Sequence, residues 1–409
     1  MQSATPRENR RHDLVVYGAS GFVGRLVVEY LAARYPQGGA LRWAVAGRSR
    51  ARLEAMLEEC AGNGARPDVI VADCHDRAAL DRLARDTRVV LTTVGPYAKY
   101  GSELVAACVA NGTDSCDLCG EVRWMRRMID QHQAAAQASG ARIVMCCGFD
   151  SIPSDLGVFA LQQHARQVGG RPCSEITLFV RAMKGGVSGG TIASMLIATE
   201  QARKNESDAA VLADPYGLNP DGEREGPDGP DQIASQFHAG AGEWTAPFVM
   251  ASINTRVVRR TNALLGHPHG RDFRYQEAIA CGKGLRGRIK AGLISTGVRL
   301  LTSSSLAQRG VARLGPKPGE GPSRKKRESG CFNLLLIGKQ ADGKVLRLRV
   351  KGDRDPGYGS TSKMCAESAI CLAKDELGTA GGFWTPAAAM GAPLLNRLTA
   401  SAGLRFEPE

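Results

Sequence analysis

The sequence has 409 residues, of which 43% are hydrophobic and 23% are charged, and this is the composition of an ordinary globular protein. This length exceeds one typical hydrophobic core, so we expect two domains. The formal net charge is +12, no apolar run is long enough to span a bilayer, and the first residues lack the apolar stretch of a signal peptide. We therefore expect a cytoplasmic protein and leave peripheral membrane contact open.

The first predicted strand, Leu14–Tyr17, runs into a glycine-rich turn and then a helix. Glycines stand at positions 18, 21 and 24, the spacing of dinucleotide-binding turns. The first permits a tight turn, the second lets the backbone approach a phosphate, and the third lets the helix pack closely. The residues expected to bind the cofactor here are Gly18, Ser20, Gly21, Phe22, Val23 and Gly24.

The second predicted strand, Leu41–Ala46, is followed by Arg48, Ser49 and Arg50. An NAD site usually has an acidic residue at this junction to bind the ribose 2′-hydroxyl. Here there is none, and guanidinium and hydroxyl groups suit a 2′-phosphate. The sequence therefore predicts NADPH as the cofactor, the alternative being a solvated basic start to the next helix.

The third and fourth predicted strands, Asp68–Ala72 and Val89–Val94, end at further candidate contacts. Asp73 is expected near the adenine. Gly95 and Pro96 are expected near the nicotinamide, because open α/β sheets bind ligands at the carboxyl ends of their strands; the alternative is a rigid loop.

Two more strands, Ser115–Leu118 and Arg142–Cys147, complete six that alternate with helices. This pattern predicts an α/β fold with a doubly wound parallel sheet, the Rossmann type.

A set of motifs in this order resembles the saccharopine dehydrogenase-like oxidoreductases, and within them the mycobacterial trans-acting enoyl reductases. The motifs are Gly18–Gly24, Ala46–Arg48, Val94–Tyr97, Asp117–Glu121 and Gly148–Asp155. The resemblance implies a second α+β domain inserted before a C-terminal return. We predict the dinucleotide-binding domain at 1–155, completed by 356–409, and the substrate domain at 156–355.

The resemblance also implies NADPH-dependent reduction of a carbon–carbon double bond in a polyketide acyl chain held on the carrier domain of a synthase. The lipid products would be of the phthiocerol and phenolphthiocerol dimycocerosate type. The enolate formed by hydride addition needs a proton donor. From position along the fold we predict Tyr97, with Lys99 and Tyr358 as weaker candidates. The alternatives are an amino-acid or imine oxidoreductase of the saccharopine type and a non-catalytic NADP-binding scaffold.

Positive charge is concentrated in the second domain. Residues 256–315 contain 12 Lys and Arg against two acidic residues, and residues 316–330 add five against two. Apolar and basic residues alternate at helical spacing between Leu285 and Leu314. Three interpretations stay open: docking of an acidic carrier domain, contact with an anionic membrane, and a solvated basic face over a buried apolar one. No nucleic-acid partner is expected, and a homodimer remains open.

The sequence contains 12 cysteines, which we expect to be free thiols. Cys116 and Cys119 have CxxC spacing without a second pair at a zinc-site distance, so we expect no metal. Ser188 and Thr191 are candidate caps of a helix that could bind an anion, or simple helix caps. Strands are expected at Phe248–Asn254 and Phe273–Ala278.

Overall fold

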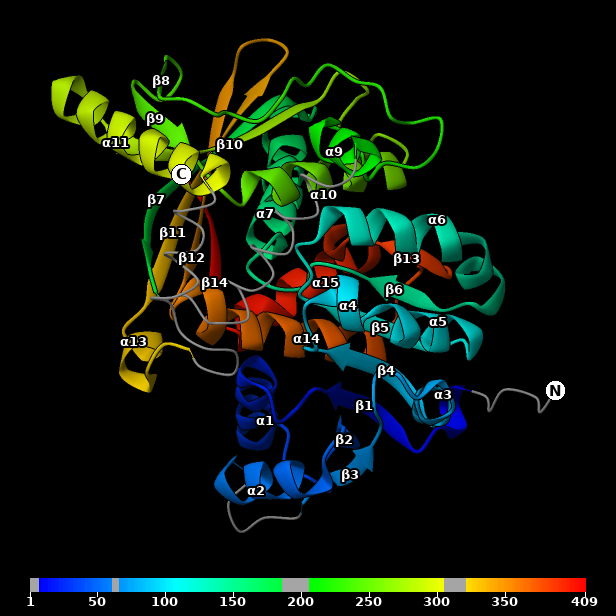
Figure 1. The fold of residues 1–409 in the computed structure, drawn as a ribbon. Helices are drawn as coiled ribbons and strands as arrows, with labels where there is room; N and C mark the ends of the chain where they lie inside the picture. Colours follow the sequence, from blue (N-terminus) through cyan, green and yellow to red (C-terminus); the bar gives the residue numbers. More distant parts are fainter. Residues whose placement is uncertain (1–6, 61–65, 186–205, 305–320) are drawn as a thin grey trace. The chain divides into compact units, whose positions relative to one another are not determined.

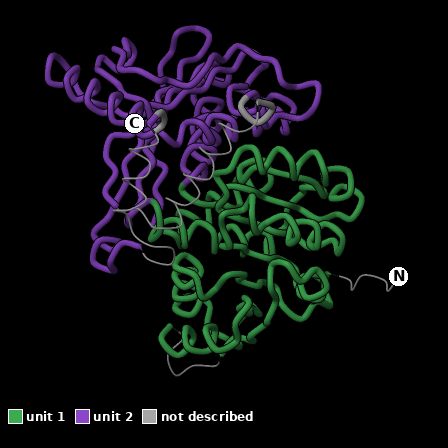
Figure 2. The backbone as a smooth tube through the Cα atoms, viewed as in Figure 1, with its two compact units in different colours: residues 1–149, 357–402 green, residues 150–356, 403–409 purple. Residues whose placement is uncertain are grey.

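The structure is a computed structural model that describes residues 7–60, 66–185, 206–304 and 321–409 (Figure 1). The chain forms two compact units, drawn in two colours in Figure 2. Unit 1 consists of Met1–Phe149 and Gly357–Ala402, and unit 2 of Asp150–Pro356 and Gly403–Glu409. The anion site expected at Ser188 and Thr191 lies outside the described residues.

Unit 1 is built on a seven-stranded sheet in which every described pair of neighbouring strands is parallel. The strand order is β13-β6-β5-β4-β1-β2-β3. The strands are β1 (His12–Tyr17), β2 (Trp43–Gly47), β3 (Asp68–Val71), β4 (Thr87–Thr92), β5 (Asp114–Asp117), β6 (Arg142–Val144) and β13 (Gly382–Trp384). The strands β1, β2 and β5 are buried along their whole length, as expected of a sheet covered on both faces.

Helices cover this sheet in two layers, visible in Figure 1. In one layer, α14 (Thr361–Lys374) contacts β1, β4 and β5 and packs against α1 (Phe22–Arg34) and α15 (Pro386–Ser401), and α1 in turn contacts α2 (Arg50–Cys60). In the other layer, α5 (Ser102–Ala110) packs between α3 (Arg77–Arg85) and α6 (Val122–Ser139). The predicted doubly wound α/β fold is confirmed.

The C-terminal return adds an element that the sequence does not predict. Residues 381–386 read as a turn because of their glycines, yet Gly382–Trp384 form β13, parallel to β6. The buried carboxylate of Glu367 on α14 holds this layer together: it accepts hydrogen bonds from the Tyr30 hydroxyl at 2.6 Å and the Tyr35 hydroxyl at 2.8 Å, and pairs with Arg397 at 3.4 Å.

Unit 2 contains a second seven-stranded sheet, of mixed direction, in the order β14-β12-β11-β7-β10-β9-β8. Its strands are β7 (Cys173–Lys184), β8 (Gln236–His238), β9 (Glu243–Pro247), β10 (Arg274–Gly282), β11 (Cys331–Gln340), β12 (Val345–Gly352) and β14 (Leu404–Pro408). Its described helices are α7 (Ile152–Gly169), α9 (Glu206–Ala213), α10 (Ala251–Leu264), α11 (Gly284–Ser303) and α13 (Arg324–Glu328).

Two expectations for unit 2 are wrong. Residues 403–409 do not complete the dinucleotide-binding domain, because Leu404–Pro408 pair with β12 and Leu404 is fully buried in unit 2. The strand expected at Phe248–Asn254 is replaced by the start of α10, and the preceding residues Glu243–Pro247 supply the strand β9.

Candidate functional site: a dinucleotide-binding edge

The glycine turn joins β1 to α1 at the carboxyl edge of the parallel sheet. Gly18 has a φ of +85°, and a Cβ there would lie 2.5 Å from Val94 Cγ2. The Gly18 N–H donates to the Ala46 carbonyl at 2.8 Å, so the turn is anchored to the end of β2. Both the left-handed φ and the lack of space require glycine at this position.

The other two glycines set how closely α1 approaches the turn. A Cβ on Gly24 would lie 2.2 Å from the Gly18 oxygen, so only glycine allows this close packing. Gly21 caps α1 without a side-chain hydrogen bond and is exposed, as is Ser20. Phe22 and Val23 form the first, half-buried residues of the helix. The N-terminus of α1 thus lies beside a bare glycine backbone, and this arrangement fits a pyrophosphate.

The three polar residues after β2 have different roles. The Ser49 hydroxyl accepts a hydrogen bond from the Arg52 N–H at 3.4 Å at the start of α2, and Arg50 pairs with Glu54 at 3.5 Å along that helix. Arg48 is exposed and follows β2 directly, and in the described chain no carboxylate forms an ion pair with it. Because β1 and β2 are parallel neighbours, Arg48 lies at the same edge as the glycine turn. Of the three, Arg48 is the side chain available for a 2′-phosphate.

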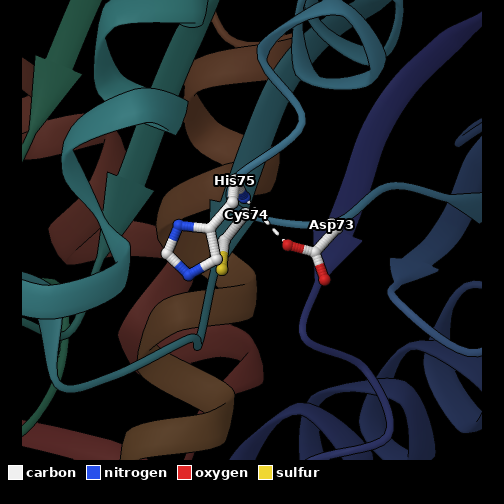
Figure 3. A group of neighbouring side chains, drawn as sticks. All are labelled: Asp73, Cys74 and His75. Atoms are coloured by element: carbon white, nitrogen blue, oxygen red, sulfur yellow. Dashed lines mark hydrogen bonds between the residues drawn. The ribbon is translucent and has the colours of Figure 1, made fainter.

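Asp73 follows β3, at the next position along this edge, with Cys74 and His75 beside it (Figure 3). Its carboxylate accepts a hydrogen bond from the His75 N–H at 2.9 Å, which closes a local turn. Potential ligand atoms of the three residues lie within 4.8 Å of one another. Burial raises the pKa of the Cys74 thiol, however, and a protonated thiol is a poor metal ligand. We therefore interpret this group as a turn at the adenosine end of the site.

The end of β4 is tied to the glycine turn and leads into Gly95 and Pro96. The Thr93 N–H donates to the Tyr17 carbonyl at 3.0 Å, and its hydroxyl contacts the Gly18 carbonyl at 3.2 Å. Gly95 is exposed, Pro96 is half-buried, and the peptide bond between them is cis. This segment therefore lies where the two halves of the sheet diverge, between β1 and β4, which is the ligand-binding position in such folds.

The geometry does not support Tyr97 as the proton donor. Its hydroxyl donates to the Thr92 carbonyl at 3.0 Å and accepts from the Leu118 N–H at 3.3 Å. Its ring lies 5.4 Å from the Trp124 ring. Burial raises the pKa of Tyr97 well above its ordinary value. Tyr97 is therefore a packing residue that fixes the loop after β4.

The two weaker candidates differ in their surroundings. Tyr358, in a π-helical turn at Pro356–Ser360, is buried, and its ring meets the Phe22 ring edge-on at 5.2 Å. It therefore lies against the first residue of α1. Lys99 is exposed, with its ammonium group 5.1 Å from the Tyr100 ring centre on α4 (Tyr97–Tyr100). Of the three predicted donors, the fold brings Tyr358 to the glycine turn.

Two acidic residues that support the site were missed in the sequence. The Glu121 carboxylate accepts hydrogen bonds from the Tyr97 and Ala98 N–H groups, both at 2.8 Å, and so caps α4. Asp117, at the end of β5, accepts from the Cys119 and Cys146 N–H groups at 2.9 and 3.0 Å. Burial raises the pKa of Asp117 to about 7. Their only signal was membership of the motif Asp117–Glu121.

This strand order, the glycine turn and the base after β2 define a dinucleotide-binding protein of the Rossmann class. The sequence profile of the saccharopine dehydrogenase NADP binding domain matches residues 14–144. A putative trans-acting enoyl reductase of Mycobacterium tuberculosis is 43% identical over 421 residues, covering 98% of this chain and 97% of its own. The trans-acting enoyl reductase of Mycobacterium bovis BCG is 39% identical and covers 95% and 96%. The chain belongs to the trans-acting enoyl reductase family of saccharopine dehydrogenase-like proteins.

Solved structures agree with this fold. Saccharopine dehydrogenase (L-Glu forming) of Saccharomyces cerevisiae superposes with a TM-score of 0.52 at 13% identity, over 97% of this chain and 99% of that one. The homospermidine synthase of Legionella pneumophila gives 0.51 at 8% identity, over 98% and 91%. The named relatives and the matched NADP-binding profile identify the protein as an oxidoreductase with an NADP(H) site. Among the described residues, no helix has the length and apolarity needed to cross a membrane.

Proposed function

We propose that the protein is an NADPH-dependent enoyl reductase that acts in trans on an unsaturated acyl chain carried by a polyketide synthase. The observation that carries this proposal is the 43% identity over nearly the whole chain to a relative named for this activity. We extend it to lipids of the phthiocerol and phenolphthiocerol dimycocerosate type, which the resemblance of the motifs implies.

The chain's own residues would bind and orient the cofactor. The N-terminus of α1 binds the pyrophosphate, and Gly18, Gly21 and Gly24 leave room for it. Arg48 binds the 2′-phosphate, a group that NADPH has and NADH lacks. Gly95 and Pro96 line the nicotinamide end. A bound NADPH supplies a hydride to the β-carbon of an α,β-unsaturated thioester.

The protein must then stabilise the negative charge of the enolate and supply a proton to it. Hydride addition breaks the carbon–carbon π bond and leaves an electron pair shared between the α-carbon and the thioester oxygen. One proton at the α-carbon completes the saturated product. We propose the Tyr358 Oη as its donor, because the fold holds this ring 5.2 Å from Phe22 at the glycine turn.

Substrate panels separate this function from its alternatives. With a carrier-bound α,β-unsaturated thioester, we expect oxidation of NADPH in a one-to-one ratio with saturated product. Turnover with an amino acid or oxo acid instead would support the saccharopine-type alternative. Tight NADPH binding without turnover on either class would support a non-catalytic scaffold.

The Tyr358→Phe variant tests the proton donor separately. It keeps the ring against Phe22 and removes only the hydroxyl group, so NADPH affinity should not change. We expect kcat to fall by a factor of about 100, within the usual range for loss of a general acid. Full activity of this variant would assign the proton to another source, such as Lys99 or water.

A further inference from the structure

The helix α11 in unit 2 has an apolar face that the described residues leave exposed. Figure 1 shows it as an outer helix, next to β9. Its inner face is small: Ala291 is fully buried and packs with Ala246 and Cys281, and Ile294 is partly buried against the same cluster. One interpretation of the sequence placed the apolar face of this segment in the core. In the structure only some of the apolar residues of α11 are buried there.

The outer face carries an apolar stripe, which the exposed Thr296 interrupts between Leu293 and Leu300. The exposed fractions are 70% for Leu285, 55% for Ile289, 70% for Leu293 and 54% for Leu300. Positions 285, 289, 293 and 300 fall on one side of a helix with 3.6 residues per turn, and extend over about 22 Å at a rise of 1.5 Å per residue. Exposed aliphatic side chains in such a row are unusual on a soluble surface and indicate a binding face.

Basic residues border this stripe on both sides. With 100° per residue, Arg286 and Lys290 fall on one flank, and Arg288 and Arg299 on the other. All four are exposed, and the guanidinium of Arg288 also lies 5.5 Å from the Trp244 ring. No acidic residue occurs between 283 and 304. The helix is therefore amphipathic, with apolar residues at the centre of its exposed face and cations at the margins.

We propose that α11 binds the surface of an anionic lipid bilayer and lies in the plane of the interface. The stripe would enter the boundary between headgroups and acyl chains, and the flanking cations would contact lipid phosphates. An acidic carrier domain would be attracted by the same cations, but it would leave a four-residue aliphatic row without an apolar partner. A bilayer matches both the row and its charged margins.

Vesicle sedimentation tests this proposal without any turnover, so its result is independent of the proposed reaction. The full-length protein is mixed with phosphatidylcholine vesicles, either pure or with about 30 mol% phosphatidylglycerol. We expect binding to the anionic vesicles, weaker binding as salt rises, and at least tenfold less binding to the neutral ones.

Variants assign the binding to this face. Changing Ile289 and Leu293 together to Asn, or Arg286 and Lys290 together to Glu, should lower the partition coefficient at least tenfold. The matched control is Ile233→Asn, an 85% exposed apolar residue outside α11, which should bind like the unaltered protein. Unchanged circular dichroism and NADPH affinity show that the variants fold.

Two results would overturn the proposal. One is absence of vesicle binding by the unaltered protein, and the other is vesicle binding that the α11 variants do not weaken. In the first case, a charge variant that slows only a carrier-bound substrate, or an apolar variant that converts a dimer to a monomer, would assign α11 to a protein partner.

Discussion

Arg48 is the residue on which the preference for NADPH should depend. Ser49 and Arg50 already have partners within α2, whereas Arg48 is exposed beside the glycine turn. We expect NADPH to bind at least tenfold more tightly than NADH, equivalent to about 1.4 kcal/mol. Arg48→Asp should erase or reverse this preference, because a carboxylate repels the 2′-phosphate. Fluorescence titration with both cofactors measures it.

The matched control for this prediction is Arg50→Asp, which removes only an exposed ion pair with Glu54 and should change either affinity less than threefold. If Arg50→Asp and Arg48→Asp weaken NADPH binding equally, the 2′-phosphate is recognised by general positive charge and the assignment of Arg48 fails.

The Gly21 position tests the pyrophosphate turn. A Cβ there lies 3.2 Å from the Gly18 oxygen, and Gly21 is an exposed residue at the N-cap of α1, where valine would add bulk at the proposed phosphate position. Gly21→Val should therefore weaken NADPH binding by more than tenfold, as measured by calorimetry. Gly378→Val is the control, since a Cβ at Gly378 meets no atom within 4 Å. A Gly21→Val protein that titrates like the parent would refute the assigned phosphate position.

Asp117 predicts a pH dependence of stability. Its pKa is about 7 in the folded protein against 3.8 ordinarily, so the folded state holds a proton that the unfolded state releases. The stabilisation that this bound proton gives to the folded state is fully present below pH 3.8 and is lost as the pH rises through 7. Between pH 6 and 8 the loss is about 1.4 kcal/mol.

The Asp117→Asn variant isolates this loss. Asparagine keeps an oxygen that can accept from the Cys119 and Cys146 N–H groups but cannot ionise. Urea unfolding at pH 6 and 8 should show that the variant loses about 1.4 kcal/mol less than the parent. Asp150, whose pKa is also raised to about 7, is present in both proteins and cancels in the difference. Identical pH dependence in the two proteins would contradict the assignment.

The sequence predicted the conformational role of a residue where local spacing decides the structure. Gly18 and Gly24 are required by distances within one turn, which their spacing already encodes. The role of Tyr97 depends instead on the carbonyl of Thr92 and the N–H of Leu118, which only the folded sheet brings together. Spacing along the chain contains no information about such partners.

At the scale of elements, α14 depends on one buried carboxylate. Glu367 is fully buried and receives two tyrosine hydroxyl groups and a guanidinium. Glu367→Ala would leave Arg397 paired with Asp375 and the Tyr30 hydroxyl bonded to the Ser401 carbonyl, and it would remove the acceptor of the Tyr35 hydroxyl. We expect a loss of about 3–5 kcal/mol in the free energy of unfolding. The exposed Glu376→Ala is the control, and equal stabilities of the two variants would show that this network is dispensable.

Element type was predicted well for the first unit and less well for the second. The apolar composition of strands such as β1 and β4 is enough to predict them from the sequence. In contrast, Phe248–Asn254 contains Val and Ile, and its composition predicts a strand. Its residues from Ala251 onward instead form α10, whose buried residues include many polar side chains. Tertiary packing overrides β propensity there.

The surface charge of the second unit also depends on tertiary packing. The basic count over 256–315 overstates the surface charge, because Arg256 and Arg259 are buried in ion pairs with Asp231 and Asp228, and Arg260 is also buried. Among the described residues of this stretch, α11 carries four exposed bases, whereas Arg271, Arg274 and Lys283 are exposed outside it.

For the whole molecule, the doubly wound parallel sheet of unit 1 was predicted from the alternation of strands and helices, whereas its last strand, β13, was not predicted. The strand β13 is three residues long, and it pairs with β6, which lies more than 200 residues earlier in the chain. In the other unit, β14 pairs with β12, which lies more than 50 residues earlier. Short strands with distant partners have too few residues to show a pattern.

In the proposed reaction, hydride passes from NADPH to the β-carbon of an unsaturated acyl thioester held on a carrier domain. The most direct test is single-turnover reaction with NADPH deuterated at the transferred position of C4, followed by mass spectrometry of the acyl product. We predict one deuterium at the β-carbon and one solvent proton at the α-carbon. A product with no deuterium, or deuterium found on a carbon–nitrogen bond of another substrate class, would contradict the account.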